Sequence, residues 1–196
     1  MCLGNSITFH PPLSSVNWYS SQGMAALDPS KDYCHLLERK LKNNNSQSTV
    51  TPVNISAWER NYSINLDSLL RDYCEGKDII VIRIGENVQD KKHFSDALSN
   101  LILYCKRYTD NILLTGRFWP DADVEKAIVE NSLKYELKYV PQDWNFELYG
   151  DNCLPKEGDT LFNEQGIPYP IRGEFILTHP NDNGMRMIAD AIYNAL

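Results

Sequence analysis

Hydrophobic positions along the chain fall into short continuous runs and into stretches with helical spacing. Residues 78–84 form a near-continuous apolar run, a pattern typical of a strand buried on both faces of a parallel sheet. A helical apolar face follows over residues 94–105, and a second apolar run occupies residues 111–115. This order predicts a β-α-β unit whose first strand is central in the sheet.

The same alternation extends over most of the chain. Further helices are predicted after Asp28-Pro29-Ser30, after Asn181, and over residues 65–74 and 121–136; further strands are predicted near residues 50–54 and 137–140. Strands that alternate with helices indicate an α/β fold, here a three-layer α/β/α sandwich with a central parallel sheet and flavodoxin-like layering. A length of 196 residues predicts a single domain over residues 1–196.

Residues 141–178 lack this periodicity. The segment contains several Pro and Gly residues and is too long for an ordinary connection between elements. Long segments of this kind are often functional, so we expect it to contribute to a site.

Charge and cysteine usage narrow the classes of partner. The net charge of −7 and the scattered Lys and Arg residues argue against a nucleic-acid partner. The longest apolar stretch is too short to span a membrane. The five cysteines are far apart and contain no C-x-x-C pair, which predicts free thiols rather than disulfides or a zinc site.

The sequence is compatible with two cellular locations. Free thiols suit the cytoplasm. Almost no strand precedes Gly4, however, so a missing N-terminal segment that contained an export signal would make the protein periplasmic or secreted. No feature of the sequence indicates an oligomeric state.

Ser6 is the first candidate for chemistry. Gly4-Asn5-Ser6 follows directly on the first predicted strand, so we expect Ser6 at a strand-to-helix turn with an exposed hydroxyl and a backbone N–H that can donate to an oxyanion. The alternative is that Ser6 only caps a helix after a tight turn.

Two further candidates follow predicted elements. Asn87 ends the block Gly85-Glu86-Asn87 after the central strand, where its amide can donate to an oxyanion; the alternative is an ordinary turn-forming Asn. His179 precedes Pro180 and the final helix, where its imidazole can act as a general base; the alternative is a structural or solvated histidine.

Together these three blocks resemble the SGNH, or GDSL-like, hydrolase family from Gly4 to the last helix. The resemblance implies Ser6 as nucleophile, His179 as general base, and an oxyanion hole formed by Ser6, Ala57 and Asn87. The family needs no metal or organic cofactor, and we expect none here.

The chain departs from the family pattern at two positions. The segment Asn54-Ile-Ser-Ala-Trp58 corresponds to a further block of the family, which normally has a glycine where this chain has Ala57. Alanine keeps a backbone N–H but disfavours a positive φ. Ile176 stands three residues before His179, where the family has the acid that orients the histidine. A backbone carbonyl near Ile176 is the expected replacement, which would make the site a serine–histidine dyad.

The resulting hypothesis is a serine esterase that acts on small-molecule or carbohydrate esters through an acyl-enzyme. Acetylated carbohydrates are favoured as substrates, because four aromatic residues fall in predicted loops where their rings could stack on sugars, or else pack in the core. They are Trp18, Tyr19, Trp58 and Trp119.

Three alternatives remain. An acyltransferase would use the same acyl-enzyme, and a binding domain of this fold would have lost strong turnover with the missing acid. A flavodoxin-like nucleotide or flavin binder is disfavoured, because residues 4–8 contain a single glycine and no lysine to cradle a phosphate.

Overall fold

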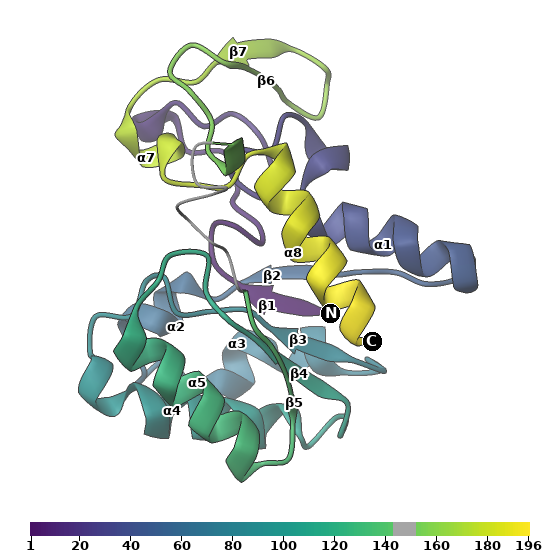
Figure 1. Ribbon diagram of the computed structural model, residues 1–196, viewed down its shortest axis with the longest axis vertical. Coiled ribbons are helices and arrows are strands. Elements are labelled where there is room, and N and C mark those ends of the chain that lie inside the picture. Colours follow the sequence, from purple (N-terminus) through teal and green to yellow (C-terminus); the bar gives the residue numbers. More distant parts are fainter. Residues whose placement is uncertain (143–151) are drawn as a thin grey trace. The chain divides into compact units, whose positions relative to one another are not determined.

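The computed structural model describes residues 1–142 and 152–196 (Figure 1). Contacts divide the chain into two compact units, each made of segments that are distant in sequence. The first unit contains Met1–Asn5, Thr51–Gln142 and Ala195, and the second contains Ser6–Val50, Asp143–Asn194 and Leu196. Residues 143–151, part of the non-periodic segment 141–178, lie outside the described residues. The single domain over residues 1–196 stays a prediction.

The first unit is built on a parallel sheet of five short strands with the order β2-β1-β3-β4-β5 (Figure 1). The strands are β1 (Cys2–Gly4), β2 (Pro52–Asn54), β3 (Ile80–Ile82), β4 (Ile112–Thr115) and β5 (Lys138–Val140). In register, Leu3 pairs with Val53 on one side and with Ile82 on the other. The apolar run at residues 78–84 therefore contains the central strand, as predicted, and every residue of β3 is buried.

Four helices belong to the same unit: α2 (Ser56–Arg60), α3 (Leu66–Cys74), α4 (Lys91–Cys105) and α5 (Ala122–Lys134). Asn65, Asp90 and Asp121 cap the last three through side-chain oxygens that accept backbone N–H groups. The core joins β-strand residues such as Ile82 to helix residues such as Leu98. Helix α2 was not predicted, because its five residues are too few to show helical periodicity.

The second unit contains α1 (Tyr33–Asn44), α7 (Glu174–Leu177) and α8 (Asp182–Ala195), with 3-10 helices at Ser14–Val16 and Pro29–Lys31. An antiparallel pair, β6 (Thr160–Phe162) and β7 (Pro168–Pro170), lies in the segment that shows no periodicity. These strands have three residues each, and β7 begins and ends with a proline. Elements this short do not show the alternation of apolar and polar residues by which a strand is predicted. The unit has a core of its own, which includes Trp18, Met24 and Ile176.

The expected α/β class, with a central parallel sheet flanked by helices, is confirmed. The five cysteines are all buried free thiols, also as predicted. Within residues 1–142 and 152–196, every helix is too short or too polar to cross a membrane.

Candidate active site

Ser6 stands two residues after β1, at the start of a turn over residues 6–8. No helix follows this turn directly, because the next helical element begins at Ser14. The expectation of a strand-to-helix turn is therefore wrong, and so is the alternative that Ser6 caps a helix. The turn is held by the Ser6 carbonyl, which accepts the N–H of Met24 at 2.8 Å.

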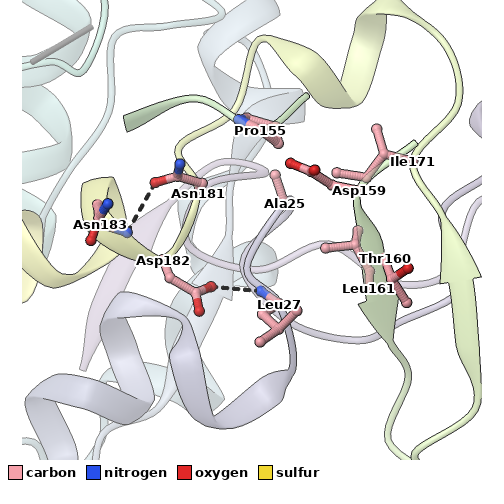
Figure 2. Close-up of a pocket in the computed structure, with 10 residues that line it drawn as sticks. All are labelled: Ala25, Leu27, Pro155, Asp159, Thr160, Leu161, Ile171, Asn181, Asp182 and Asn183. Carbon is pink, nitrogen blue, oxygen red and sulfur yellow. Dashed lines mark hydrogen bonds between the residues drawn. The ribbon is translucent and has the colours of Figure 1, made fainter. Parts of the chain in front are cut away.

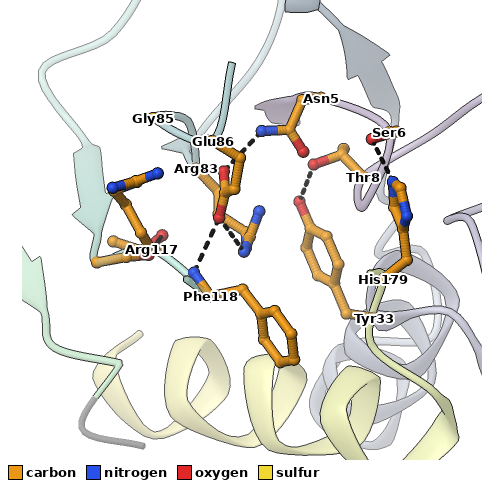
Figure 3. Close-up of polar contacts among 12 residues, drawn as sticks. Asn5, Ser6, Thr8, Tyr33, Arg83, Gly85, Glu86, Arg117, Phe118 and His179 are labelled. Carbon is orange, nitrogen blue, oxygen red and sulfur yellow. Dashed lines mark hydrogen bonds and ion pairs between the residues drawn. The ribbon is translucent and has the colours of Figure 1, made fainter. Parts of the chain in front are cut away.

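The Ser6 hydroxyl and the His179 imidazole meet within the second unit. The distance between Ser6 Oγ and His179 Nε2 is 2.7 Å, although 173 positions separate the two residues in sequence (Figure 3). His179 is 7% exposed, so little water competes for this hydrogen bond. A hydroxyl and an imidazole at this distance satisfy the geometric requirement for a nucleophile and its general base.

The other imidazole nitrogen of His179 contacts the backbone. Nδ1 lies 2.9 Å from the carbonyl oxygen of Phe175 in α7, and 3.4 Å from the hydroxyl oxygen of Thr178. A carbonyl can only accept, so Nδ1 carries the proton and Nε2 is left as the acceptor for the Ser6 hydroxyl. The acceptor is thus a carbonyl next to Ile176, the kind of partner expected from the sequence.

Two carboxylates lie near His179 in sequence, those of Glu174 and Asp182. Asp182 Oδ1 accepts the N–H of Leu27 at 2.7 Å, and burial raises the pKa of Asp182 above its ordinary value. Glu174 opens α7 and is exposed. Asn181 caps α8 as predicted, by accepting the N–H groups of the helix's second and third residues.

Asn87 belongs to the first unit, where its side-chain amide is held at both ends. Nδ2 donates to Glu59 Oε2 at 3.0 Å, and Oδ1 accepts from Arg60 Nη2 at 2.7 Å. The Nδ2 group has two N–H bonds, so one remains after the contact with Glu59.

Ala57 lies in the first turn of α2 and is exposed. Amide groups in the first turn of a helix have no intrahelical acceptor, so the N–H of Ala57 is not used by the helix ladder. Positive φ values among the described non-glycine residues occur at Asn17, Ala25 and Glu136. Ala57 therefore needs no conformation that only glycine accepts easily.

Two glutamates follow the carboxyl ends of strands in the first unit. Glu59 is fully buried and accepts the N–H of Gly85 at 2.5 Å. Burial, and then the nearby charge of Glu86, raise the pKa of Glu59 to about 7. Glu59 was not predicted from the sequence, where its only signal is its position directly after residues 54–58.

Glu86 lies among donors (Figure 3). It accepts from Asn5 Nδ2 at 2.6 Å, from Arg83 Nη2 at 2.8 Å and from the N–H of Phe118 at 2.8 Å. Burial acts to raise the pKa of Glu86, but the Arg83 charge and these hydrogen bonds outweigh it and hold the pKa below its ordinary value. Glu86 is therefore the more readily ionised member of the pair.

The aromatic residues predicted as a substrate rim behave differently from one another. Trp18 and Trp58 are buried, so of the two alternatives core packing holds for them. Each packs on a tyrosine ring, Trp18 at 6.3 Å from Tyr169 and Trp58 at 5.4 Å from Tyr62. Tyr19 is 43% exposed, and Trp119 is partly exposed. The large apolar surface of an indole ring favours burial, and the rings of Trp18 and Trp58 each pack in the hydrophobic core of their own unit.

Phe175 was not singled out from the sequence. Its side chain is 45% exposed, and its ring centre lies 5.3 Å from that of His179. A phenylalanine four residues before a candidate histidine is a weak signal by itself, because it becomes informative only when a helical turn brings the two rings together.

A separate pocket of about 310 Å³ lies in the second unit (Figure 2). It is lined on one side by Asn181 and Asp182 at the start of α8, and on another by Thr160 and Leu161 of β6. Neither Ser6 nor His179 lines it. Among the residues that the structure describes, no group of three or more His, Cys, Asp or Glu side chains is placed to hold a metal ion.

The fold is similar to those of several solved α/β structures. No protein-family model and no curated protein matches the sequence. An acetyl xylan esterase, AlAXEase, is similar with a TM-score of 0.62 and 15% identity over 100% of both chains. The acetylxylan esterase Axe2 from Geobacillus stearothermophilus is similar with a TM-score of 0.64 and 13% identity, covering 99% of this chain and 91% of its own.

A third similar structure is LAE5, an α/β hydrolase from the metagenome of Lake Arreo, with a TM-score of 0.64 and 13% identity over 99% of this chain and 92% of its own. Catalytic mutants of Axe2 replace a histidine in one structure and a serine in another. At these identities the likeness establishes a shared fold.

Proposed function

We propose that the chain is a serine esterase of the SGNH type, with Ser6 as nucleophile and His179 as general base. The observation that carries this proposal is the 2.7 Å hydrogen bond between Ser6 Oγ and His179 Nε2. The Phe175 carbonyl on Nδ1 supports it, because it leaves Nε2 as the proton acceptor that a base requires.

In the proposed reaction, His179 Nε2 takes the Ser6 proton as Oγ attacks the ester carbonyl. The tetrahedral oxyanion is stabilised by the N–H groups of Ser6 and Ala57 and by the Asn87 amide. The imidazolium then protonates the departing alcohol and leaves an acyl-enzyme. Water, deprotonated by His179, attacks this ester, and the collapse of the second intermediate returns the proton to Ser6.

The backbone carbonyl on Nδ1 makes this a dyad. It fixes the tautomer of His179, as an aspartate would. It carries a dipole rather than a full negative charge, so it stabilises the imidazolium less. We therefore expect slower turnover than a triad with the same oxyanion donors would give.

We propose acetylated carbohydrates as the substrate class. The acetyl xylan esterases with the same fold support this choice. Phe175 adds a half-exposed ring beside His179, and aromatic faces of this kind stack on sugar rings. Tyr19 and Trp119 remain proposed rim residues, whereas the burial of Trp18 and Trp58 removes them from this role.

The test is hydrolysis of p-nitrophenyl acetate and of an acetylated xylo-oligosaccharide by the wild type, Ser6→Ala and His179→Ala. We expect both variants to lose about 10³-fold or more in kcat/KM. His93→Ala is the matched control, because His93 is exposed and pairs with Asp90 at the start of α4. Equal activity of the wild type and Ser6→Ala would refute the proposal, and equal inertness of all four proteins would favour a binding domain.

A further inference from the structure

Two residues adjacent in sequence hold opposite ends of one amide. Glu59 Oε2 accepts from Asn87 Nδ2 at 3.0 Å, and Arg60 Nη2 donates to Asn87 Oδ1 at 2.7 Å. Both come from α2, so the spacing between the two contacts is set by a single helical turn. Glu59 is buried and Arg60 is exposed.

This pairing determines which way round the amide lies. The oxygen and nitrogen of an Asn side chain have almost the same shape, so packing alone does not choose between the two orientations. Above pH 7 Glu59 is mostly ionised, so its carboxylate only accepts hydrogen bonds, whereas the Arg60 guanidinium only donates them. A reversed amide would set Oδ1 against the Glu59 carboxylate and Nδ2 against the Arg60 guanidinium, which loses both hydrogen bonds and opposes like partners.

Glu59 also fixes the backbone around Asn87. Its Oε1 accepts the N–H of Gly85 at 2.5 Å and lies 3.5 Å from the N–H nitrogen of Asn87 and from Nδ2 of Asn5. Asn5 is the residue directly before Ser6 in sequence. One carboxylate therefore contacts the side chain of Asn87, the turn that contains it and the residue preceding the proposed nucleophile.

We propose that Glu59 is a positioning residue for oxyanion stabilisation: together with Arg60, it orients the Asn87 amide so that the second Nδ2–H is available to the substrate oxyanion. This inference rests on the proposed function, because it takes Asn87 as an oxyanion donor. Glu59 touches neither the substrate nor the reacting atoms and acts through Asn87.

The electrostatic cost of Glu59 supports a role beyond packing. It is buried close to a second carboxylate, Glu86, and these two effects raise the pKa of Glu59 to about 7. The Arg117 charge faces the same cluster. A neutral side chain of the same shape would avoid this cost, but it would not hold the amide in one orientation. Buried carboxylates with a strongly shifted pKa concentrate at functional sites.

The test is a double-mutant cycle of Glu59→Gln with Asn87→Ala, read as kcat and KM on p-nitrophenyl acetate. Glutamine keeps the shape of Glu59 but offers an NH2 group that can pair with Asn87 Oδ1, which would turn the carbonyl of Asn87 toward the oxyanion. We expect Glu59→Gln to lower kcat by about 10- to 100-fold with KM changed less than about 3-fold. In the Asn87→Ala background, the same substitution should change kcat by less than about 3-fold.

If Glu59→Gln lowers kcat equally with and without the Asn87 side chain, Glu59 acts without Asn87 and the inference is overturned. The inference is also overturned if Glu59→Gln leaves kcat unchanged in the otherwise wild-type protein. If Glu59→Gln does not fold, Arg60→Gln on the exposed side of the amide decides by the same cycle, with an expected loss of about 3- to 10-fold. Glu125→Gln is the control for losing a half-buried carboxylate in the first unit, where Glu125 accepts from Tyr139 and from the N–H of Arg117.

The two proposals fail in different ways. If Ser6→Ala is as active as the wild type, or Asn87→Ala keeps the wild-type kcat, the proposed function or its oxyanion donor is wrong. If both of those variants are impaired and Glu59→Gln is not, the inference alone is wrong.

Discussion

The carbonyl oxygen of Phe175 lies 2.9 Å from His179 Nδ1, one helical turn before it in the chain. The acceptor is a backbone group of α7, so the local secondary structure fixes the orientation of the imidazole. No single side-chain substitution removes this acceptor. The orientation of His179 should therefore not depend on the side chain at position 176.

An acid introduced at position 176 should lower stability without raising kcat. Ile176 is fully buried in the core of the second unit, so Ile176→Asp would bury an unpaired carboxylate and remove apolar contacts. We expect the free energy of unfolding to fall by about 3 to 5 kcal/mol, with no gain in kcat. Urea unfolding followed by circular dichroism measures the first quantity and ester hydrolysis the second.

Ile176→Val is the matched control, with an expected loss of about 0.5 to 1.5 kcal/mol and unchanged kcat. A variant Ile176→Asp that is as stable as the wild type and faster would show that the aspartate reaches Nδ1. The description of His179 as oriented by the backbone alone would then be wrong.

Gly85 should be intolerant of a side chain. Its φ is +129°, and a Cβ built there would lie 2.8 Å from Cδ of Arg117. Gly85→Ala should cost about 1 to 3 kcal/mol of stability and lower kcat, because the turn leading to Asn87 must shift. Gly76→Ala is the control, since φ is +67° and nothing lies within 4 Å; a cost as large there as at Gly85 would contradict the role of the Arg117 contact.

Glu59 should make stability depend on pH in a defined direction. Its pKa is about 7 in the folded protein against an ordinary value of 4.5, so the unfolded chain releases this proton first as pH rises. The contribution of Glu59 to stability is present in full below pH 4.5 and is lost as pH rises through 7, by on the order of 3 kcal/mol.

The measurement is the free energy of unfolding of the wild type and of Glu59→Gln between pH 4.5 and 8.5. The difference between the two proteins should shift in favour of Glu59→Gln as pH rises, since glutamine does not titrate. Parallel curves would mean that the folded and unfolded states bind the Glu59 proton equally.

Substitution of Phe175 tests the proposed recognition of sugars separately from the proposed chemistry. Phe175→Ala removes a half-exposed ring but keeps the carbonyl that holds His179. We expect KM for an acetylated xylo-oligosaccharide to rise about 3- to 10-fold, while kcat on p-nitrophenyl acetate changes less than about 2-fold. Leu133→Ala, an exposed position in α5, is the control; equal effects of the two changes on KM would remove Phe175 from the substrate rim.

Local patterns in the sequence were sufficient to predict much of the fold. The apolar run at residues 78–84 identified the central strand, and helical spacing with capping residues such as Asn65 and Asn181 located the main helices. These features depend on residues close together in the chain, so periodicity and capping chemistry report them directly. Helix α2 and the strand pair β6–β7 were not predicted, because they are too short to show a periodic pattern of apolar residues.

The site was predictable only in part. Three short blocks of the sequence made Ser6 and His179 the candidate pair and predicted that Ile176 does not orient the histidine. Only the tertiary structure brought Oγ within 2.7 Å of Nε2, supplied the Phe175 carbonyl, and paired Glu59 with Asn87. Hydrogen-bond partners and burial depend on segments far apart in sequence, so composition and spacing predict which residue types are present but not which of them are desolvated together.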